Sequence, residues 1–269
     1  MKVTAMDVLG SLFNPTETVC FRVFEDRKDG IFHGAKLECE CGKYMGIEET
    51  LRQHNEKNRG IFFVVNYGGH DDAAITRINA QFFEMDKGTF EEQQAKIDAF
   101  PLSPSMVIKT RKSLHVYYFV ESTATVERFR EIQQQLVKHF DGDPMCVNES
   151  RVMRLPGYYH CKQEPVMVEC VLFHPERRYT QRQISELMPA IEEQVVEKKL
   201  GSEKGLNVVR HECAFIRYCQ ERADALPEHD WYAMITNLAP FEGGVELIHR
   251  LSAPYPGYSE AETQKKINH

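Results

Sequence analysis

Two carboxylates separated by one residue stand near the end of a segment with strand character. Glu84 and Asp86 flank Met85 at the end of residues 80–86. Residues i and i+2 of a strand point to the same face, so both side chains converge on one side of a sheet. Two neighbouring carboxylates repel unless a cation lies between them, and Mg²⁺ or Mn²⁺ suits that arrangement. Taken alone, such a pair is more often a solvated acidic edge.

A cluster of cationic and hydrogen-bonding residues follows at a predicted hairpin turn. Its members lie within seven residues, and they are Lys109, Arg111, Lys112, Ser113 and His115. Ser113 and His115 are again two residues apart and share a face of their strand. A hydroxyl, an imidazole N–H and cationic head groups are suitable donors to phosphate oxygens. Basic hairpin turns are common, so the cluster is a weak signal by itself.

A third charged group follows the longest predicted helix of the first 175 residues. It combines two carboxylates, two arginines before a Pro-Gly turn and two further polar residues, namely Asp141, Asp143, Arg151, Arg154, His160 and Lys162. An arginine beside the apolar residues Met153 and Leu155 is poorly explained by solvation. A guanidinium that is held in a fixed position and binds phosphate through two hydrogen bonds explains it better. The alternative interpretation is a loop of solvated charges.

The elements that must position these residues alternate between strands and helices over the first 175 residues. The pattern predicts strands at 19–24, 61–66, 80–86, 106–110, 114–120 and 166–173, and helices at 45–58, 89–100 and 125–140. The strands at 106–110 and 114–120 are expected to form a hairpin around the sequence TRKS. Hairpin-like neighbours favour an α+β fold, with mixed or antiparallel sheets flanked by helices, over a doubly wound parallel sheet.

From residue 180 the sequence changes character. It predicts a charged helix at 180–199, a linker-like break at 200–205 and helices at 207–225, 229–238, 243–252 and 259–268, with prolines between the later helices. We therefore expect a catalytic core at 1–178, a connecting helix and linker at 179–206, and a small all-α domain at 207–269. The last helix begins well at Ser259 and stops in mid-pattern, which favours a chain that continues beyond residue 269.

The three chemical groups occur in an order that resembles the archaeo-eukaryotic primase superfamily, and most closely its primase-polymerase branch of plasmids, phages and integrated elements. Its motifs match Glu84 and Asp86, then Ser113 and His115, then Asp143, and residues 154–157 (RLPG) resemble a segment after the third motif. Glu84 replaces the commoner Asp and keeps its charge. The resemblance covers about residues 1–175, and parts of 231–263 resemble the helical domain that often follows such cores.

The resemblance implies a template-directed nucleotidyltransferase, a DNA primase or primase-polymerase that makes primers on single-stranded DNA from NTPs or dNTPs. It would act in the replication of a mobile element or phage. Two Mg²⁺ or Mn²⁺ ions would activate the 3′-hydroxyl and neutralise the pyrophosphate. They would be held by Glu84, Asp86 and Asp143. Either Asp141 or Asp143 could be the third ligand, and the spacing to the RLPG segment favours Asp143.

Phosphate contacts are expected from two sources, the resemblance for Ser113 and His115 and positive charge for the cationic residues. Ser113 and His115 would bind the nucleotide triphosphate, with Lys112, Arg111 and Arg154 as additional nucleotide contacts. Contacts to template or phosphate are also expected from Lys109, Arg151, His160 and Lys162. A fused or separate helicase would be a compatible partner. The choice between NTPs and dNTPs stays open.

Two other functions are alternatives to this interpretation. A metal-dependent nuclease would need the carboxylates. It would not need the Ser-x-His and Arg residues to bind a free nucleotide triphosphate. A replication initiator that only binds DNA would need neither, and the intact acidic positions argue against it. A rolling-circle nicking enzyme would need a His-x-His metal pair, and the sequence contains none.

Composition limits the cellular setting. The 269 residues contain 42% hydrophobic residues and carry a net charge of −7, enough apolar material for a real core. No run of about 18 apolar residues predicts a membrane span, and the N-terminus lacks a secretion signal. We therefore expect a cytoplasmic protein with no membrane partner. Its net charge is negative, and its basic residues are concentrated near 109–112 and 151–162. This distribution predicts weak, salt-sensitive DNA binding.

The eight cysteines offer one alternative to this picture. Cys39 and Cys41 are separated by one residue, and Cys20 and His33 could complete four zinc ligands. One-residue spacing is not the usual spacing of zinc knuckles. Reduced, partly buried thiols of a cytosolic protein are the favoured interpretation, and no zinc is assigned.

Overall fold

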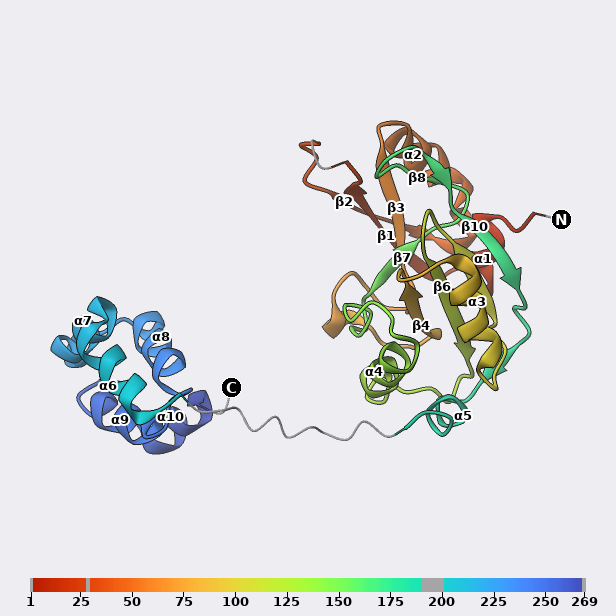
Figure 1. The fold of residues 1–269 in the computed structure, drawn as a ribbon. Coiled ribbons are helices and arrows are strands. Elements are labelled where there is room, and N and C mark those ends of the chain that lie inside the picture. The colour runs from red at the N-terminus through yellow and green to blue at the C-terminus, as the bar shows by residue number, and fades with distance from the viewer. Residues whose placement is uncertain (1, 28–29, 190–200, 268–269) are drawn as a thin grey trace. The chain divides into compact units, whose positions relative to one another are not determined.

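The computed structural model describes residues 2–27, 30–189 and 201–267, and these fall into two compact units (Figure 1). The first unit comprises Met1–Glu192 and the second Glu193–His269. The division between them falls inside the connection expected at 179–206. Each unit has a hydrophobic core of its own.

The first unit contains two main sheets. One is antiparallel, with strand order β2-β1-β3-β7, formed by Ala35–Glu40, Thr18–Glu25, Arg59–Val64 and Val152–Arg154. The other has β6 (Leu114–Val120) at its centre, between β5 (Met106–Lys109) and β4 (Ala80–Met85), both antiparallel to it. At its margins, β10 (Glu169–Phe173) pairs with β5, and β11 (Arg178–Tyr179) runs parallel to the end of β6. A small hairpin joins β8 (Tyr159–His160) to β9 (Val166–Met167).

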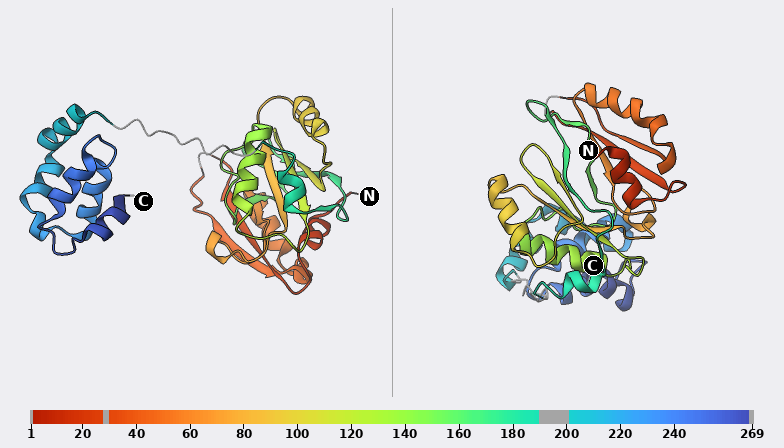
Figure 2. Two further views of the ribbon diagram at one scale, coloured as in Figure 1. Left: turned by 90° about the horizontal axis from the view of Figure 1, so that it is seen from below. Right: turned by 90° about the vertical axis from the view of Figure 1, so that its right-hand side faces the viewer.

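Helices cover these sheets. They are α1 (Ala5–Leu12), α2 (Met45–Glu56), α3 (Phe90–Ala99), α4 (Phe129–Phe140) and α5 (Gln181–Ser185), with short 3-10 helices η1 (Cys41–Lys43) and η2 (Asp72–Ala74). α2 packs on β3, and α4 packs on β4 and lies beside α5 (Figure 2). The apolar face of α4 explains its position, since Phe140 stacks on Phe83 of β4 with ring centroids 4.2 Å apart. The expected α+β fold is thus confirmed.

The register of β4 and β6 brings the first two sequence motifs together. Glu84 lies opposite His115, and Met85 lies opposite Leu114. The end of β4 therefore meets the start of β6, and residues that are about thirty positions apart in the sequence become cross-strand neighbours. The hairpin predicted for 106–120 is confirmed by the pairing of β5 with β6.

The second unit is a bundle of five described helices around a buried tryptophan. They are α6 (Glu203–Glu212), α7 (Ala214–Glu221), α8 (Glu228–Leu238), α9 (Gly244–Ser252) and α10 (Glu260–Ile267), with η3 at Ala223–Ala225. Trp231 of α8 stacks on Tyr255, and its indole N–H donates to Ser252 Oγ at 2.8 Å. Among the described residues, no helix is both long and apolar enough to cross a bilayer.

Three predicted elements differ from the structure. The strand at 166–173 is interrupted at Val168, because β9 pairs with β8 whereas β10 pairs with β5. The helix at 207–225 is two helices, because Cys213 adopts an extended conformation. The first of them begins at Glu203, within the linker-like break expected at 200–205, because the Ser202 side chain caps its N-terminus. The charged helix at 180–199 ends with α5 at Ser185, ahead of Pro189, which disfavours helix in the residue before it. The remainder of that prediction, 190–199, lies outside the described residues.

Candidate active site

Two carboxylates from distant parts of the chain meet at the end of β4. An oxygen of Glu84, an oxygen of Asp143 and the Cys146 thiol sulfur all lie within 4.8 Å of one another. The backbone N–H of Asp143 donates to the carbonyl of Glu84 at 2.8 Å, which fixes the loop after α4 against the strand. A Cβ on Gly142 would lie only 2.9 Å from that carbonyl. The glycine therefore permits the close approach of the two segments.

The structure separates the two aspartates that the sequence left as alternatives. Asp141 caps the end of α4 in a left-handed conformation with φ 52°. Its carboxylate forms an exposed ion pair with Lys87 at 2.6 Å and is not part of the group around Glu84. The Asp143 carboxylate faces Glu84 and accepts hydrogen bonds from Arg151 at 3.1 Å and from the Met145 N–H at 2.9 Å.

Asp86 lies one residue beyond β4 and is not one of the three residues of this group. Its Oδ2 forms an ion pair with Lys112 Nζ at 2.9 Å, on a partly exposed edge. An exposed pair of this kind contributes at most about 1 kcal/mol. Replacing Lys112 by a bound cation at Asp86 would therefore cost little free energy.

Ser113 and His115 both contact Glu84. Ser113 Oγ donates to Glu84 Oε1 at 2.8 Å, and His115 Nε2 lies 3.5 Å from the same oxygen. Thr110 Oγ1 shares a 2.7 Å hydrogen bond with Ser113 Oγ, a contact that the sequence analysis did not anticipate. His115 is 2% exposed, and its Nδ1 is buried without a partner among the described residues.

These contacts determine the charge of Glu84. Burial by itself would raise the pKa of its carboxyl, but the His115 charge and the hydrogen bonds from His115 and Ser113 outweigh burial. The pKa is lowered to about 2. Glu84 is therefore an anion at neutral pH, as a ligand for a cation must be.

The donor set fits a hard divalent cation. Glu84, Asp143 and the adjacent Asp86 offer carboxylate oxygens, which Mg²⁺ and Mn²⁺ prefer. Burial raises the pKa of the neighbouring Cys146 thiol to about 12. Mg²⁺ and Mn²⁺ prefer oxygen to sulfur donors, so the carboxylate oxygens are the ligands expected for these ions at this position.

Arg154 is held beside the site by a partner that the sequence analysis missed. Its guanidinium makes two hydrogen bonds to Asp26 at 2.6 and 3.1 Å and lies 4.5 Å from the centroid of the Phe62 ring. Asp26 follows β1, is 9% exposed and also accepts from the Cys161 N–H at 2.8 Å. A single acid after an apolar strand is not a recognisable motif, so only the structure reveals this pair.

Of the other residues predicted to contact phosphate, one lies in the site and the rest have other surroundings. Arg151 lies in the site, where it contacts Asp143. Arg111 donates to the Glu164 carbonyl at 2.8 Å, and Lys162 is exposed. Lys109 lies on the opposite face of the hairpin, because it pairs with Leu114 whereas His115 pairs with Ile108. Its Nζ lies 4.1 Å over the Phe90 ring of α3, away from Glu84, and its contact to template or phosphate stays a prediction.

His160 is a buried imidazole close to Arg154 and His115. It is 8% exposed, and both ring nitrogens lack a partner among the described residues. Burial, followed by repulsion from Arg154, lowers its pKa to about 4. Lys162 and His115 lower it further, and Asp26 opposes them. The ring is therefore neutral at neutral pH.

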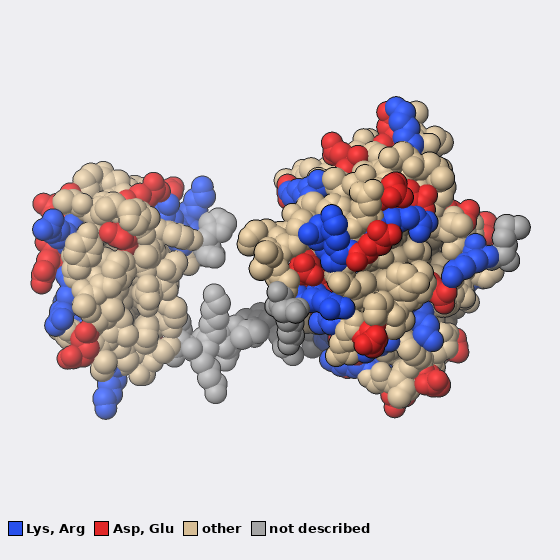
Figure 3. Space-filling view, turned by 90° about the horizontal axis from the view of Figure 1, so that it is seen from above, with Lys and Arg blue, Asp and Glu red and all other residues tan. Residues whose placement is uncertain are grey.

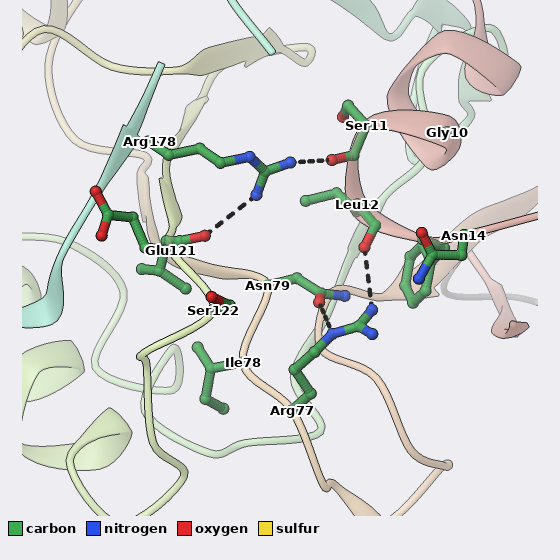
Figure 4. A pocket seen from close by; sticks show the side chains of 12 residues that line it. Gly10, Ser11, Leu12, Asn14, Arg77, Ile78, Asn79, Glu121, Ser122 and Arg178 are labelled. Carbon is green, nitrogen blue, oxygen red and sulfur yellow. Dashed lines mark hydrogen bonds between the residues drawn. The ribbon is translucent and has the colours of Figure 1, made fainter. Parts of the chain in front are cut away.

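A cavity of about 600 Å³ lies at the opposite end of β4 and β6 from the carboxylates. Arg178 donates there to the carbonyls of Ser11 and Val120, and Arg77 contacts Asn79 and Leu12 (Figure 4). These guanidiniums fix the end of α1 to the sheet. Strands of this length are about 20 Å long, so the cavity is remote from Glu84.

The surface charge is mixed on the face shown in Figure 3. Lys and Arg side chains alternate there with Asp and Glu on each unit, and they form no single basic field.

The cysteines group differently from the zinc alternative raised by the sequence. Among the described residues, Cys20 meets Glu38 and His70, whereas Cys39, Cys41 and His33 join no such group. The reason is strand alternation, because Cys20 pairs with Glu38 across β1 and β2, and Cys39 pairs with Val19 on the other face.

Comparisons with known proteins agree with this geometry. A family model described as the RepB DNA-primase N-terminal domain matches residues 78–195. The structure is similar to the archaeo-eukaryotic primase domain of the cyanophage S-2L primase-polymerase, with a TM-score of 0.59, 26% identity and coverage of 67% of this chain and 94% of that one. No curated protein matches significantly.

Two further structures share the fold. The catalytic domain of primase RepB′, solved in complex with initiator DNA, has a TM-score of 0.50, 13% identity and coverage of 68% of this chain and 95% of that one. Primase RepB′ has a TM-score of 0.50, 15% identity and coverage of 98% of both chains. The family model and the primase-polymerase structure together support a relationship to the archaeo-eukaryotic primase and primase-polymerase family.

Proposed function

We propose that this chain is a DNA primase or primase-polymerase that makes primers on single-stranded DNA by nucleotidyl transfer from NTPs or dNTPs. The observation that carries the proposal is the convergence of Glu84 with Asp143, beside Asp86, at one end of the sheet. A half-buried acid held as an anion, next to a second acid from a distant segment, is typical of a cation site rather than of a solvated edge. The RepB′ complex with initiator DNA supports a DNA substrate.

In this proposal Glu84, Asp86 and Asp143 hold Mg²⁺ or Mn²⁺. When bound, such ions would lower the pKa of a 3′-hydroxyl and offset charge on the pyrophosphate. Glu84 stays ionised because Ser113 and His115 contact it, and Asp143 is oriented by Arg151.

The triphosphate would lie over Ser113, His115 and Lys112. Lys112 becomes available when Asp86 leaves it for a cation, so metal binding and phosphate binding are coupled. Arg154 contributes positive charge from a fixed position, because Asp26 holds both arms of its guanidinium. The helical unit at 201–267 is proposed to act with the catalytic unit during initiation.

The test is a primer-synthesis assay on single-stranded DNA, without added primer, in which NTPs and dNTPs are compared with Mg²⁺ and with Mn²⁺. We expect new strands from the wild type and a loss of at least 100-fold for Asp86→Ala with an unchanged circular dichroism spectrum. Asp98→Ala, an exposed acid of α3, is the charge-matched control. Shortening of the template would indicate a nuclease instead, and DNA binding without synthesis would indicate an initiator.

A further inference from the structure

Three metal-ligating side chains meet on the β1–β2 sheet, away from the carboxylates of β4. Cys20 Sγ, a Glu38 carboxylate oxygen and a His70 ring nitrogen all lie within 4.8 Å of one another. Cys20 and Glu38 are directly opposed in the antiparallel register of β1 and β2. His70 comes from the loop between β3 and β4, so the group joins three segments of the chain.

These three groups have no other partners in the described part of the chain. Cys20 is a free thiol with 5% exposure, and neither it nor the Glu38 carboxylate makes a hydrogen bond or ion pair there. The Nδ1 atom of His70 is buried and lacks a hydrogen-bond partner. A buried polar atom left unpaired typically costs about 1–3 kcal/mol, so a ligand that satisfies it is expected.

We propose that Cys20, Glu38 and His70 bind a zinc ion. A thiolate, an imidazole nitrogen and a carboxylate oxygen form a mixed soft and borderline donor set, which suits Zn²⁺. Three protein ligands leave a fourth position for water in tetrahedral geometry. Mg²⁺ and Mn²⁺ prefer oxygen donors alone, so this site and the carboxylate site select different ions.

The surrounding charges are compatible with the ion. Arg22 and Lys36 form the next cross-strand pair on the sheet face that carries Cys20 and Glu38. Arg22 Nη2 and Lys36 Nζ lie 3.6 and 3.5 Å from Asp71 Oδ1. Arg22 also donates to the His70 carbonyl and so fixes the loop that carries the ring. Burial and the Glu38 charge raise the pKa of Cys20, and Arg22 and Lys36 oppose that effect. Zinc binding would release the thiol proton to solvent, so occupancy rises with pH.

The ion would stabilise the loop between β3 and β4, which carries His70. Asp72, two residues after His70, accepts hydrogen bonds from the backbone N–H of Ser150 at 2.9 Å, from its hydroxyl at 2.6 Å and from Asn148 at 3.0 Å. Arg151, the residue after Ser150, contacts Asp143. A zinc ion bound by His70 would therefore stabilise a loop connected to the carboxylate site.

The experiment uses the full chain and two readouts. Metal content is measured by mass spectrometry after dialysis, and Co²⁺ is then added to the stripped protein as a spectroscopic probe. We expect one equivalent of zinc and a thiolate-to-cobalt absorption band that disappears in Cys20→Ser and in His70→Gln. Zinc should also raise the unfolding midpoint of the wild type and leave that of His70→Gln unchanged.

The control variants separate this site from other thiols. Cys146→Ser removes the thiol beside the catalytic carboxylates, and Cys39→Ser removes the half-buried thiol on the other face of β2. Both should keep the cobalt band. Glu38→Gln changes an exposed residue, and it should weaken cobalt binding at least 10-fold without unfolding the protein. A band that survives in Cys20→Ser, or cobalt binding that is unaffected by Glu38→Gln, would overturn the proposal.

Discussion

At the scale of single residues, the proposed chemistry depends on which carboxylates face one another. Glu84 and Asp143 are neighbours, whereas Asp141 pairs with Lys87 at the surface. Both aspartates precede the same arginine-rich segment and differ by two positions, so the local sequence separates them only weakly. Their different surroundings provide a matched pair of variants.

We expect Asp143→Asn to abolish primer synthesis, with a loss of at least 100-fold, because the amide removes a charge from the proposed cation site. Asp141→Asn should retain synthesis within about twofold, since an exposed ion pair contributes little. Primer-synthesis rates with saturating Mn²⁺ provide the measurement. Equal losses in the two variants would contradict the assignment of Asp143.

His115 has a separate expected effect. His115→Ala removes a proposed triphosphate contact and should raise the apparent KM for nucleotides by at least 10-fold. Steady-state extension of a supplied primer measures that constant directly. An unchanged KM would remove His115 from the nucleotide site.

His160 should make stability depend on pH. Its pKa is about 4 in the folded protein and about 6.5 in the unfolded chain. Between those values the unfolded state binds more protons, so the free energy of unfolding rises with pH, by at most about 1.4 kcal/mol per pH unit. Denaturation from pH 4 to 7 should show a shallower slope for His160→Gln than for the wild type. The exposed variant His174→Gln is the control, and an identical slope in all three proteins would contradict the prediction.

At the scale of elements, the site is assembled where strands end. β4 supplies Glu84, β6 supplies His115, the turn before β6 supplies Ser113, and the loop after α4 supplies Asp143. The Asp26–Arg154 pair joins the end of β1 to β7 and, through the Cys161 N–H, to the segment after β8. It therefore orients Arg154 and connects strands at the same time.

We expect Asp26→Ala to lower the free energy of unfolding by about 3–5 kcal/mol, because it leaves the Arg154 guanidinium buried and unpaired. Glu48→Gln breaks an exposed pair with Arg52 on α2 and should cost less than about 1 kcal/mol. Urea denaturation compares the two variants. A small, equal effect would mean that the buried pair does not hold these strands.

At the scale of the whole molecule, the two units have separate hydrophobic cores. Trp231 is the sole tryptophan of the sequence and is buried in the second unit. Its fluorescence therefore reports the unfolding of that unit alone. This property allows the stability of each unit to be followed separately.

We expect Ile235→Ala, in the core of the second unit, to destabilise the fluorescence-detected transition by about 2–5 kcal/mol. Hydrogen exchange in peptides from residues 2–189 should be unchanged. Phe83→Ala in β4 should give the reverse pattern. If either variant accelerated exchange in both units, the units would unfold as one cooperative body.

The sequence alone was sufficient to predict the α+β class, most strands and helices, and the residue types of the candidate site. Those features depend on local periodicity, helix capping and turn residues, which are encoded over a few neighbouring positions. Only the tertiary structure decided that Asp143 faces Glu84, that Asp26 holds Arg154, that Lys109 lies on the other face of its hairpin, and that Cys20 meets Glu38 and His70. Such contacts depend on strand register and helix packing between distant segments, and local patterns do not specify either.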